Sequence, residues 1–569
     1  MIVLVAPGTP DRRKAGGQQA LVQTAHSRLM VLMLLFAAGI ALVLGRLAML
    51  AILAEPASSR DAAAALVPIR GDIVDRNGTA MARTIDAWSI GVHPDKVIGD
   101  KLQLADELAV LMPEHDAAYY YKALNGASSF TYLRRRALPE LVNAVNALGE
   151  PGIAFAREPE RLYPQTTLAA HTLGSLDFDG HGISGMEKVL DAELTNPAMR
   201  GKPVPLSIDL RVQGALESEL GRSMAAFQAA GAAGVILDVA TGEVRAMASL
   251  PSFNPNKLTR GGAGLMNNVT QSVYELGSVF KPITVAEAID SGVVSDISRR
   301  VDATAPLPIG RFHIRDDHAQ RRWLNMPELL IYSSNIATAR IADEMGQARL
   351  EHLFRKVGFD TAPDIEIEKA RPLWPRSWGR ATTLTTAYGH GIAVTPLHLA
   401  SAYAALVNGG TWRPATLRKV EPGHASKGRR VFSEATSAKM RAMMRLIVLE
   451  GTGRKGEAPG YRVGGKTGTG EKPGAGGYSK KINVSTFAAA FPMDAPRYVV
   501  IAMLDSSKRV EANSFQTTAA YTAAPVVSRV ISRTGALLGV RPDLNRDIDL
   551  SDITPLIWRA PGESRSVAE

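Results

Sequence analysis

The chain has 569 residues, of which 46% are hydrophobic and 21% are charged, and its formal net charge is +10 at pH 7. This composition excludes a largely disordered protein, and the length allows several folded domains. The absence of cysteine excludes disulfides, thiol nucleophiles and thiolate metal sites. The positive charge is compatible with an anionic membrane or polymer as a partner, and equally with a simple margin of solubility.

The first predicted element is a membrane-spanning helix. Residues 29–45 are uncharged and almost wholly apolar, and the apolar pattern resumes after Arg46. About 20 such residues cross the hydrocarbon core of a bilayer, and an arginine near the end of the span can reach the interface. A cleaved signal peptide, with an apolar core of only about 7–15 residues, and a buried core helix are the alternatives. We expect a cytoplasmic tail at 1–28 and a transmembrane helix at 29–53.

The residues before this run indicate its orientation. One acid, Asp11, and four basic residues precede it, namely Arg12, Arg13, Lys14 and Arg28. Cytoplasmic flanks carry an excess of lysine and arginine, so the N-terminus is expected in the cytoplasm and the remaining residues outside it. A function that needs ATP in the large external part is therefore disfavoured.

A mixed α+β domain is predicted at 54–205, after a juxtamembrane linker at 55–65. The Asp75-Arg76-Asn77-Gly78 stretch is typical of a hairpin turn. Short helical patterns, such as residues 103–112, then alternate with loops. This part of the chain has no evident cluster of catalytic residue types.

A second α+β domain is predicted at 206–545, with a polar, frayed C-terminal tail at 546–569. Its expected strands are 234–239, 243–250, 484–492 and 498–505, and its expected helices are 276–290, 325–345 and 517–538. Early and late strands with helices between them predict one antiparallel sheet assembled from distant parts of the chain.

Residues 460–467, GYRVGGKT, fit the phosphate-binding pattern G-x-x-x-x-G-K-[ST]. That loop needs a strand before it and a helix after it, whereas here loop residues precede it and glycine and proline follow. Residues 451–456 likewise fit the dinucleotide pattern but follow a helical segment. We interpret 462–469 as a strand with Lys466 beside glycines that admit another backbone, such as that of a bound peptide.

Three short motifs follow one another at wide spacing. They are Ser278-x-x-Lys281, Ser333-x-Asn335 and Lys466-Thr467-Gly468. Alone, each is weak: the first also fits a solvated helix start, the second a helix cap, and the third a turn. Together and in this order they are typical of penicillin-binding proteins and class A β-lactamases.

The chain resembles class B penicillin-binding proteins over nearly its whole length. The resemblance lies in the N-terminal anchor and in RGDIVDRNG (70–78), ERLYP (160–164), GISGMEK (182–188), YELGSVFK (274–281), YSSN (332–335), the stretch 451–469 and TAAP (522–525). Leu276, Val279, Ser334 and Phe253-Asn254 depart from commoner family residues without removing a reacting group.

The resemblance implies an anchor, an elongated non-catalytic pedestal, and a transpeptidase domain with a central antiparallel sheet of about five strands flanked by helices. It implies a serine D,D-transpeptidase that cross-links peptidoglycan stem peptides ending in D-Ala-D-Ala and is acylated by β-lactams. The septal, FtsI-type enzymes of cell division are most similar, and the elongation-type enzymes are the close alternative. No cofactor, metal or nucleic acid is implied.

The residue types also support a mechanism. Ser278 is the expected nucleophile, and Lys281 is a base if burial and the neighbouring Lys466 keep it neutral. Ser333 would shuttle a proton, and Asn335 would orient Lys281 and hold the substrate amide. The substrate carboxylate is expected at Lys466, Thr467, Gly468 and Thr469, and the backbone N–H groups of Ser278 and Thr469 are expected to form the oxyanion hole.

Several other residues are interpreted as structural. Arg70, Gly71, Asp75 and Arg76 belong to the expected hairpin between the two domains, together with Asn77-Gly78. Arg161 and Glu187 are expected to form a salt bridge in the pedestal. His171, His313 and His318 are interpreted as ordinary loop or core histidines.

Two other functions remain open at this stage. A D,D-carboxypeptidase or β-lactamase would use water as the acceptor, although neither needs a pedestal. A penicillin-binding sensor or a division scaffold would make the chemistry secondary. The resemblance also implies a SEDS-type glycosyltransferase and other division proteins as partners, and the bacterial inner membrane, with the catalytic domain in the periplasm, as the location.

Overall fold

The structure is a computed structural model that describes residues 12–53, 70–177, 179–199, 201–258, 264–474 and 477–559. The chain divides into two units, Met1–Val67 and Pro68–Glu569, which are described separately. The expected linker at 55–65, the first eleven residues and the last ten residues of the expected tail lie outside the described residues.

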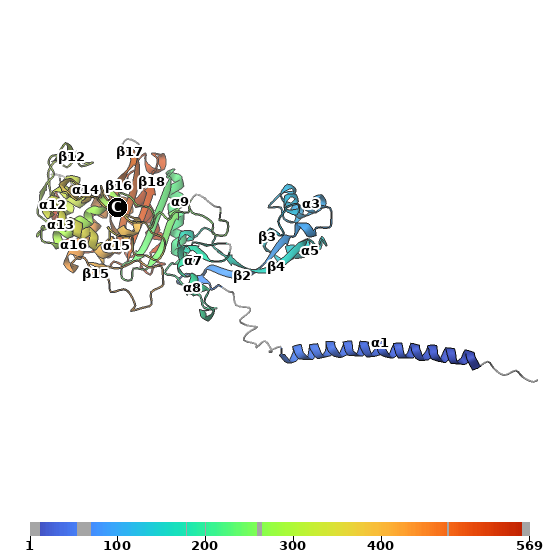
Figure 1. The fold of residues 1–569 in the computed structure, drawn as a ribbon. Helices are drawn as coiled ribbons and strands as arrows, with labels where there is room; N and C mark the ends of the chain where they lie inside the picture. The colour runs from blue at the N-terminus through green and yellow to red at the C-terminus, as the bar shows by residue number, and fades with distance from the viewer. Residues whose placement is uncertain are drawn as a thin grey trace, which may run out of the picture. The chain divides into compact units, whose positions relative to one another are not determined.

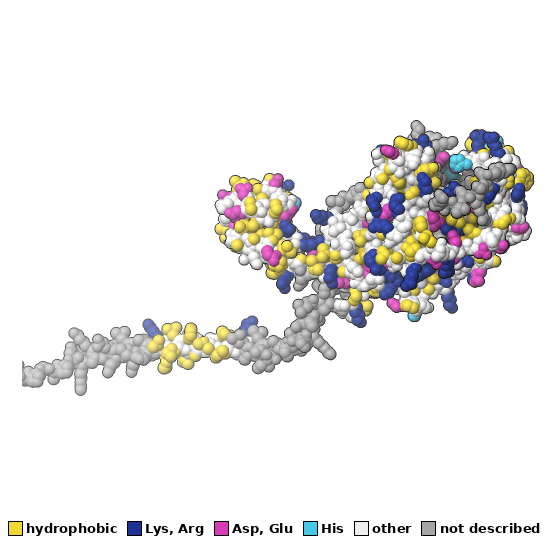
Figure 2. All heavy atoms as spheres, turned by 180° about the vertical axis from the view of Figure 1, so that it is seen from behind, with side chains coloured by type: hydrophobic (Ala, Val, Ile, Leu, Met, Phe, Trp, Pro, Cys, Tyr) yellow, Lys and Arg dark blue, Asp and Glu magenta, His cyan; other side chains and the backbone are white. Residues whose placement is uncertain are grey.

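The first unit contains a single helix in its described part, α1 (Arg12–Leu53). Residues Ser27–Arg46 are long and apolar enough to cross a membrane. Figure 2 shows this stretch as a band of hydrophobic side chains with Lys/Arg side chains at both ends. In the sequence, Arg28 and Arg46 lie at the two ends of the stretch. Twenty helical residues span about 30 Å, the thickness of a bilayer core. The helix begins at Arg12, well before the predicted start, because the polar residues ahead of the apolar run are also helix formers.

The second unit begins with a small five-stranded sheet (Figure 1). Its strands are β1 (Ile73–Val74), β2 (Ala80–Val92), β3 (Thr131–Ala137), β4 (Ile153–Leu162) and β7 (Val204–Pro205). The long strand β2 pairs antiparallel with β1, β3 and β4. Its far end is covered by α3 (Lys101–Leu111), α4 (Ala117–Leu124) and α5 (Pro139–Asn146) around one apolar cluster that includes Val92, Leu108 and Tyr120.

Short elements between 170 and 199 enclose a group of buried ions. These elements are α6 (Ala170–Leu173), β5 (Ser175–Leu176), β6 (Gly182–Ser184), α7 (Gly185–Val189) and α8 (Asp191–Leu194). The fully buried Glu187 carboxylate accepts hydrogen bonds from Arg70 at 2.9 Å and from Arg161 at 2.8 Å. Arg161 also donates to the Gly71 carbonyl at 2.8 Å. These contacts tie the start of the unit to β4 and α7.

The turn at 75–78 connects β1 to β2 and contacts the start of the larger domain. Asp75 accepts backbone N–H bonds from Asn77 at 2.9 Å and Thr79 at 2.8 Å, and a longer one from Leu210 at 3.2 Å. Arg76 donates to the Ser207 carbonyl at 3.2 Å. Gly78 has φ +87°, a conformation that favours glycine at this position of the turn.

The larger domain is built on a second five-stranded sheet in the order β16-β17-β18-β8-β9, with every neighbouring pair antiparallel. The strands are β8 (Gly231–Asp238), β9 (Val244–Leu250), β16 (Gly464–Gly474), β17 (Gly477–Phe491) and β18 (Tyr498–Asp505). Early and late parts of the chain thus meet in one sheet, and the predicted α+β class and five-stranded antiparallel sheet are confirmed.

Both faces of this sheet are covered by helices. Helices α9 (Leu210–Ala226) and α17 (Ala523–Thr534) share one apolar cluster with Ile236, whereas α15 (Pro396–Val407) belongs to the other cluster, with Val235. Adjacent strand residues point to opposite faces, so consecutive residues of β8 enter different cores. This explains why β8 is buried along its whole length and reads as a continuous apolar run.

Helices on the α15 side make up the rest of the domain. They are α10 (Lys281–Asp290) with the preceding 3₁₀ turn Gly277–Phe280, α11 (Met326–Ile331), α12 (Asn335–Met345), α13 (Gln347–Lys356), α14 (Arg380–Thr386) and α16 (Glu434–Glu450). The loops between these helices contain three two-stranded ribbons: β10 (Val301–Asp302) with β13 (Trp323–Leu324), β11 (Leu307–Ile309) with β12 (Phe312–Ile314), and β14 (Thr411–Trp412) with β15 (Arg429–Arg430).

Two expectations about this domain are wrong, one about a helix and one about the C-terminal tail. The single helix expected at 325–345 is broken after Ile331 and restarts at Asn335, because Ser333 has φ +58° and cannot continue a right-handed helix. The described part of the expected frayed tail, 546–559, packs against the domain, since Ile553 and Ile557 are buried and Asp547 pairs with Arg445 at 2.7 Å.

Candidate active site

The three sequence motifs meet at one side chain, Ser333. Its hydroxyl lies 3.1 Å from the Lys281 ammonium nitrogen and 3.0 Å from that of Lys466. Lys281 also donates to the Ser333 carbonyl. Lys281 begins α10, Ser333 lies in the turn between α11 and α12, and Lys466 lies on β16. Residues nearly 200 positions apart thus form a single hydrogen-bonded group.

Ser278 lies in the 3₁₀ turn directly before Lys281 and is partly exposed. Its hydroxyl makes no hydrogen bond to any described residue, whereas the Lys281 amine bonds to Ser333, so the predicted pairing of this nucleophile with Lys281 as its base stays a prediction. Pro282 follows in the first turn of α10, where its missing N–H is not needed. The serine is therefore held by its backbone alone and is open toward the solvent side.

The 3₁₀ turn that carries Ser278 lies directly against β16. A Cβ atom on Gly468 would come within 2.4 Å of the Leu276 carbonyl oxygen, and one on Gly470 within 1.8 Å of the Glu275 carbonyl oxygen. Gly277, at φ +64°, faces the Thr469 carbonyl in the same way. Gly468 and Gly470 thus admit this turn against β16, and the expected place of Gly468 among the substrate ligands stays a prediction.

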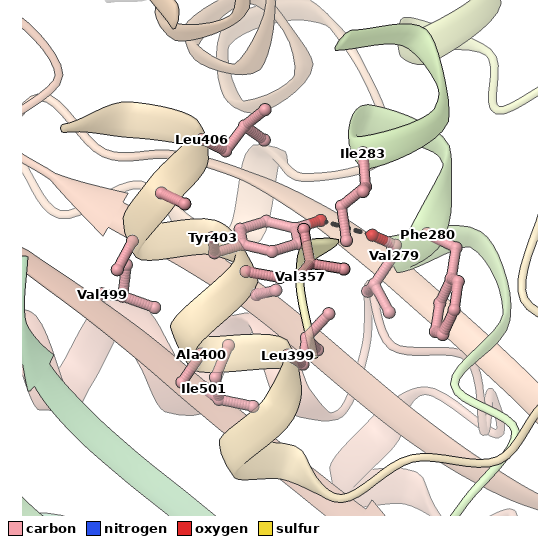
Figure 3. Packing of buried hydrophobic residues seen from close by; sticks show 14 of the residues in the cluster. Val279, Phe280, Ile283, Val357, Leu399, Ala400, Tyr403, Leu406, Val499 and Ile501 are labelled. Atoms are coloured by element: carbon pink, nitrogen blue, oxygen red, sulfur yellow. Dashed lines mark hydrogen bonds between the residues drawn. The ribbon is translucent and has the colours of Figure 1, made fainter. Parts of the chain in front are cut away.

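A buried tyrosine holds the same turn from behind. Tyr403, on α15, donates its hydroxyl to the Val279 carbonyl at 2.8 Å, and Figure 3 shows the ring enclosed by aliphatic side chains that include Ile283 and Leu406. Burial raises the pKa of Tyr403 well above its usual value, so the hydroxyl keeps its proton and remains a donor. Sequence reasoning missed this contact because Tyr403 lies 124 residues from Val279 in an ordinary apolar helix.

The two lysines are fully buried, and no carboxylate of the described residues lies in hydrogen-bonding contact with either. Burial lowers the pKa of Lys281 to about 7, and the carboxylates of Asp316 and Asp317 act in the opposite direction. Burial also lowers the pKa of Lys466 well below its usual value, and the charge of Lys281 adds to that effect. Two ammonium groups that share one hydroxyl disfavour each other's charge, so one of them is readily neutral.

The Ser-x-Asn turn is held by a carboxylate that sequence reasoning missed. Asp316 accepts hydrogen bonds from the Ser334 hydroxyl at 2.7 Å and from the Ile336 N–H at 2.9 Å. Ser334 also caps α12 by accepting from the Ala337 N–H. In the sequence, only the charged run at 315–318 could have indicated that a carboxylate holds this turn.

Asn335 donates its side-chain amide to the Arg315 carbonyl at 3.0 Å and makes no hydrogen bond to Lys281, so its expected orienting contact is absent here.

The remaining motif residues face different neighbours. The Thr467 hydroxyl lies 2.6 Å from that of Thr452, which belongs to the 451–456 stretch. The Thr469 hydroxyl accepts a long hydrogen bond, 3.4 Å, from the Ala519 N–H. Lys466 also donates to the Thr467 carbonyl at 2.9 Å. Both threonines thus follow the lysine on β16 and lie two residues apart.

Among the described residues, no group of three or more His, Asp or Glu side chains is arranged to hold a metal ion. The His171 ring contacts the Gly264 carbonyl at 2.6 Å, and burial lowers its pKa. His313 and His318 are exposed on the surface.

Comparison with known proteins agrees with this geometry. Residues 232–532 match the penicillin-binding protein transpeptidase domain, and residues 65–197 match the penicillin-binding protein dimerisation domain. The chain belongs to the penicillin-binding protein transpeptidase family. The first match contains Ser278, Ser333 and Lys466, and the second contains the buried Arg70–Glu187 pair.

Similar members of the family are known by name. The chain is 42% identical over 487 residues to the probable peptidoglycan D,D-transpeptidase FtsI of Caulobacter vibrioides, covering 83% of this chain and 82% of that relative. It is 32% identical over 471 residues to the peptidoglycan D,D-transpeptidase FtsI of Escherichia coli, covering 77% and 79%.

Among solved structures, penicillin-binding protein 3 of Mycobacterium tuberculosis, complexed with aztreonam, superposes with a TM-score of 0.65 at 24% identity. This match covers 84% of the chain and 98% of that protein and shows the shared fold. A peptidoglycan synthetase from Bifidobacterium adolescentis gives a TM-score of 0.64 at 21% identity, covering 84% and 97%.

Proposed function

We propose that the protein is a serine D,D-transpeptidase of the FtsI type, which cross-links peptidoglycan stem peptides during cell division through an acyl-enzyme on Ser278. The observation that carries this proposal is the Ser333 hydroxyl, bonded to two buried lysines, one of which lies one turn after Ser278. The names of the relatives, which are peptidoglycan D,D-transpeptidases, support the substrate class.

In the acylation step, the Ser278 oxygen attacks the carbonyl carbon between the two terminal D-alanines. Neutral Lys281 accepts the hydroxyl proton, which a charged ammonium could not do. The backbone N–H groups of Ser278 and Thr469 stabilise the oxyanion, where a single donor contributes about 3–4 kcal/mol. The C–N bond then breaks, and the leaving amine takes a proton relayed from Lys281 through the Ser333 hydroxyl.

The terminal carboxylate of the donor peptide binds beside Lys466, Thr467 and Thr469. A carboxylate there favours the charged form of Lys466, so substrate binding restores the charge that burial suppresses. In the second step, an amine of a neighbouring stem attacks the ester carbonyl of the acyl-enzyme. Its proton returns through Ser333 to Lys281, and the Ser278 oxygen leaves as the hydroxyl.

The proposed arrangement of the whole chain follows the predicted boundaries. Residues 1–28 form the cytoplasmic tail, 29–53 the span, 54–205 the pedestal, 206–545 the transpeptidase domain and 546–569 the tail. The protein would lie in the bacterial inner membrane with its catalytic domain in the periplasm, beside a SEDS-type glycosyltransferase and other division proteins. The apolar helix supports the membrane anchor.

Covalent labelling by a fluorescent penicillin tests the proposal. The wild type should be labelled, Lys281→Ala should be labelled far more slowly, and Ser278→Ala should not be labelled; labelling that persists in Ser278→Ala would identify another nucleophile. Rapid loss of the label would indicate a hydrolase of the carboxypeptidase or β-lactamase kind. Depletion in cells should give filaments for a septal enzyme, and round cells would indicate the elongation type.

A further inference from the structure

A hollow of about 640 Å³ lies outside the three motifs. It is lined by Arg300, Thr304, Arg321, Arg322, Trp323 and Trp558. Two of these residues lie on either side of β10, three lie in β13 or directly before it, and Trp558 follows the 3₁₀ turn Thr554–Leu556. None of them takes part in the mechanism above.

Two indole rings give the hollow flat apolar walls. Trp323 is 53% exposed and Trp558 is 48% exposed. Large aromatic side chains that remain this exposed are common where a protein binds a partner. The Arg322 guanidinium lies 5.0 Å from the centre of the Trp558 ring and 5.3 Å from that of Tyr332. These cation–π contacts hold the Arg322 side chain between the two rings.

The charges of the hollow are only partly neutralised. Arg322 pairs with the buried Glu328 at 2.8 Å, while its second terminal nitrogen is buried with no hydrogen-bond partner. Arg300 and Arg321 are exposed and form no ion pair with a described carboxylate. Arginine binds carboxylates through a planar pair of N–H groups, so the hollow favours an anionic ligand.

We propose that this hollow is a second binding site for peptidoglycan, separate from the cleft that holds the reacting stem peptide. A sugar ring would stack on Trp323 and Trp558, and a stem-peptide carboxylate would bind Arg300 and Arg321. Peptidoglycan carries pyranose rings and acidic peptides side by side, which matches indoles next to unpaired arginines. The proposal rests on the proposed function, because it takes peptidoglycan as the substrate polymer.

The position of the hollow relates it to the cleft. Arg322 contacts both Glu328 and Tyr332 on or directly after α11, and Tyr332 precedes Ser333 in the chain. The C-terminal segment contacts the same carboxylate, because the backbone N–H of Trp558 donates to the Glu328 side chain at 2.9 Å. A strand bound in the hollow would therefore lie next to the helix that ends at the Ser-x-Asn turn.

Calorimetric titration of the full-length chain in detergent tests this site. The chain is first acylated with benzylpenicillin, so that the cleft is filled, and acylation of Ser278 is verified by mass. The probe is a soluble disaccharide–tetrapeptide, which lacks the terminal D-Ala-D-Ala. We expect saturable binding that Trp558→Ala and Arg321→Ala each weaken by about tenfold, while Arg321→Lys retains part of the affinity.

Matched controls remove the same groups elsewhere. Tyr121→Ala deletes an exposed aromatic ring in the pedestal, and Arg541→Ala deletes an exposed arginine, so both should bind within about twofold of wild type. Unchanged unfolding temperatures would show that Trp558→Ala and Arg321→Ala remain folded. Amidation of the probe's carboxylates should weaken binding to the wild type.

Three results would overturn the second site: no binding of the probe to the acylated wild type, equal binding by all variants, or equal binding of the amidated probe. If the proposed function is wrong, benzylpenicillin would leave the mass of the peptides that contain Ser278 unchanged. Mass spectrometry therefore tests the proposed function, and calorimetry of the same sample tests the second site.

Discussion

Two of the regions in which the penicillin-binding protein buries charged side chains differ in how those charges are paired. In the pedestal, Glu187 lies between Arg70 and Arg161, so each buried charge has an opposite partner. In the cleft, Lys281 and Lys466 share one neutral hydroxyl. Paired buried ions keep their ordinary charge and hold segments together, whereas adjacent buried cations lose charge easily. The comparison separates a structural group from a reactive one.

The largest effect is expected in the cleft. Lys281→Ala removes the base next to Ser278 and should lower the rate of penicillin acylation by about 10²–10⁴-fold. Its melting temperature should not fall much, because the substitution also removes a poorly solvated amine. Stopped-flow acylation and thermal unfolding measure the two effects. The surface substitution Lys419→Ala is the control, and a Lys281→Ala enzyme with a near-normal rate would contradict the assignment.

The opposite pattern is expected in the pedestal. Glu187→Gln removes the carboxylate that two buried arginines share; Arg70 keeps Asp191, but Arg161 loses its ion pair, so the chain should be destabilised by about 3–5 kcal/mol. Acylation of the folded fraction should stay close to normal. Glu344→Gln breaks only an exposed pair with Arg299 and should cost less than about 1 kcal/mol. Equal melting temperatures for both variants would remove the distinction between the two regions.

A smaller effect tests the support behind the nucleophile. Tyr403→Phe leaves the Val279 carbonyl without its donor and should cost about 1–3 kcal/mol in the free energy of unfolding. It should also slow acylation, because that carbonyl belongs to the turn that carries Ser278. Tyr498→Phe deletes a similar buried bond, to the Leu538 carbonyl, at another place. A loss of stability without slower acylation is expected there, and the same result for Tyr403→Phe would argue against a positioning role.

The smallest effect concerns the Asp316 carboxylate, which raises the pKa of Lys281. Asp316→Asn removes that charge, so the pKa of Lys281 should fall and the rise of acylation rate with pH should move to lower pH. Asp296→Asn, on the surface, should leave the pH profile in place. A shift of the Asp316→Asn profile to higher pH would show that the turn has lost its geometry rather than its charge.

Much of the cleft was accessible to sequence reasoning, because Ser278, Lys281, Ser333 and Lys466 lie in short motifs of fixed spacing. The five-stranded sheet was also accessible, since its apolar strands lie in recognisable runs. Tyr403 and Thr452 were not, because their partners are a distant carbonyl and a hydroxyl that no local pattern indicates. The break at Ser333 was missed because a single left-handed residue interrupts an otherwise helical pattern.

The central claim is that Lys281 is neutral near neutral pH and acts as the base for Ser278. The pH dependence of penicillin acylation of the wild type tests it most directly. With a pKa of about 7, the neutral fraction of Lys281 grows about tenfold between pH 6 and pH 8, and the rate should rise by the same factor and then level off. A rate that is flat over this range, or that rises only near pH 10, would contradict the claim.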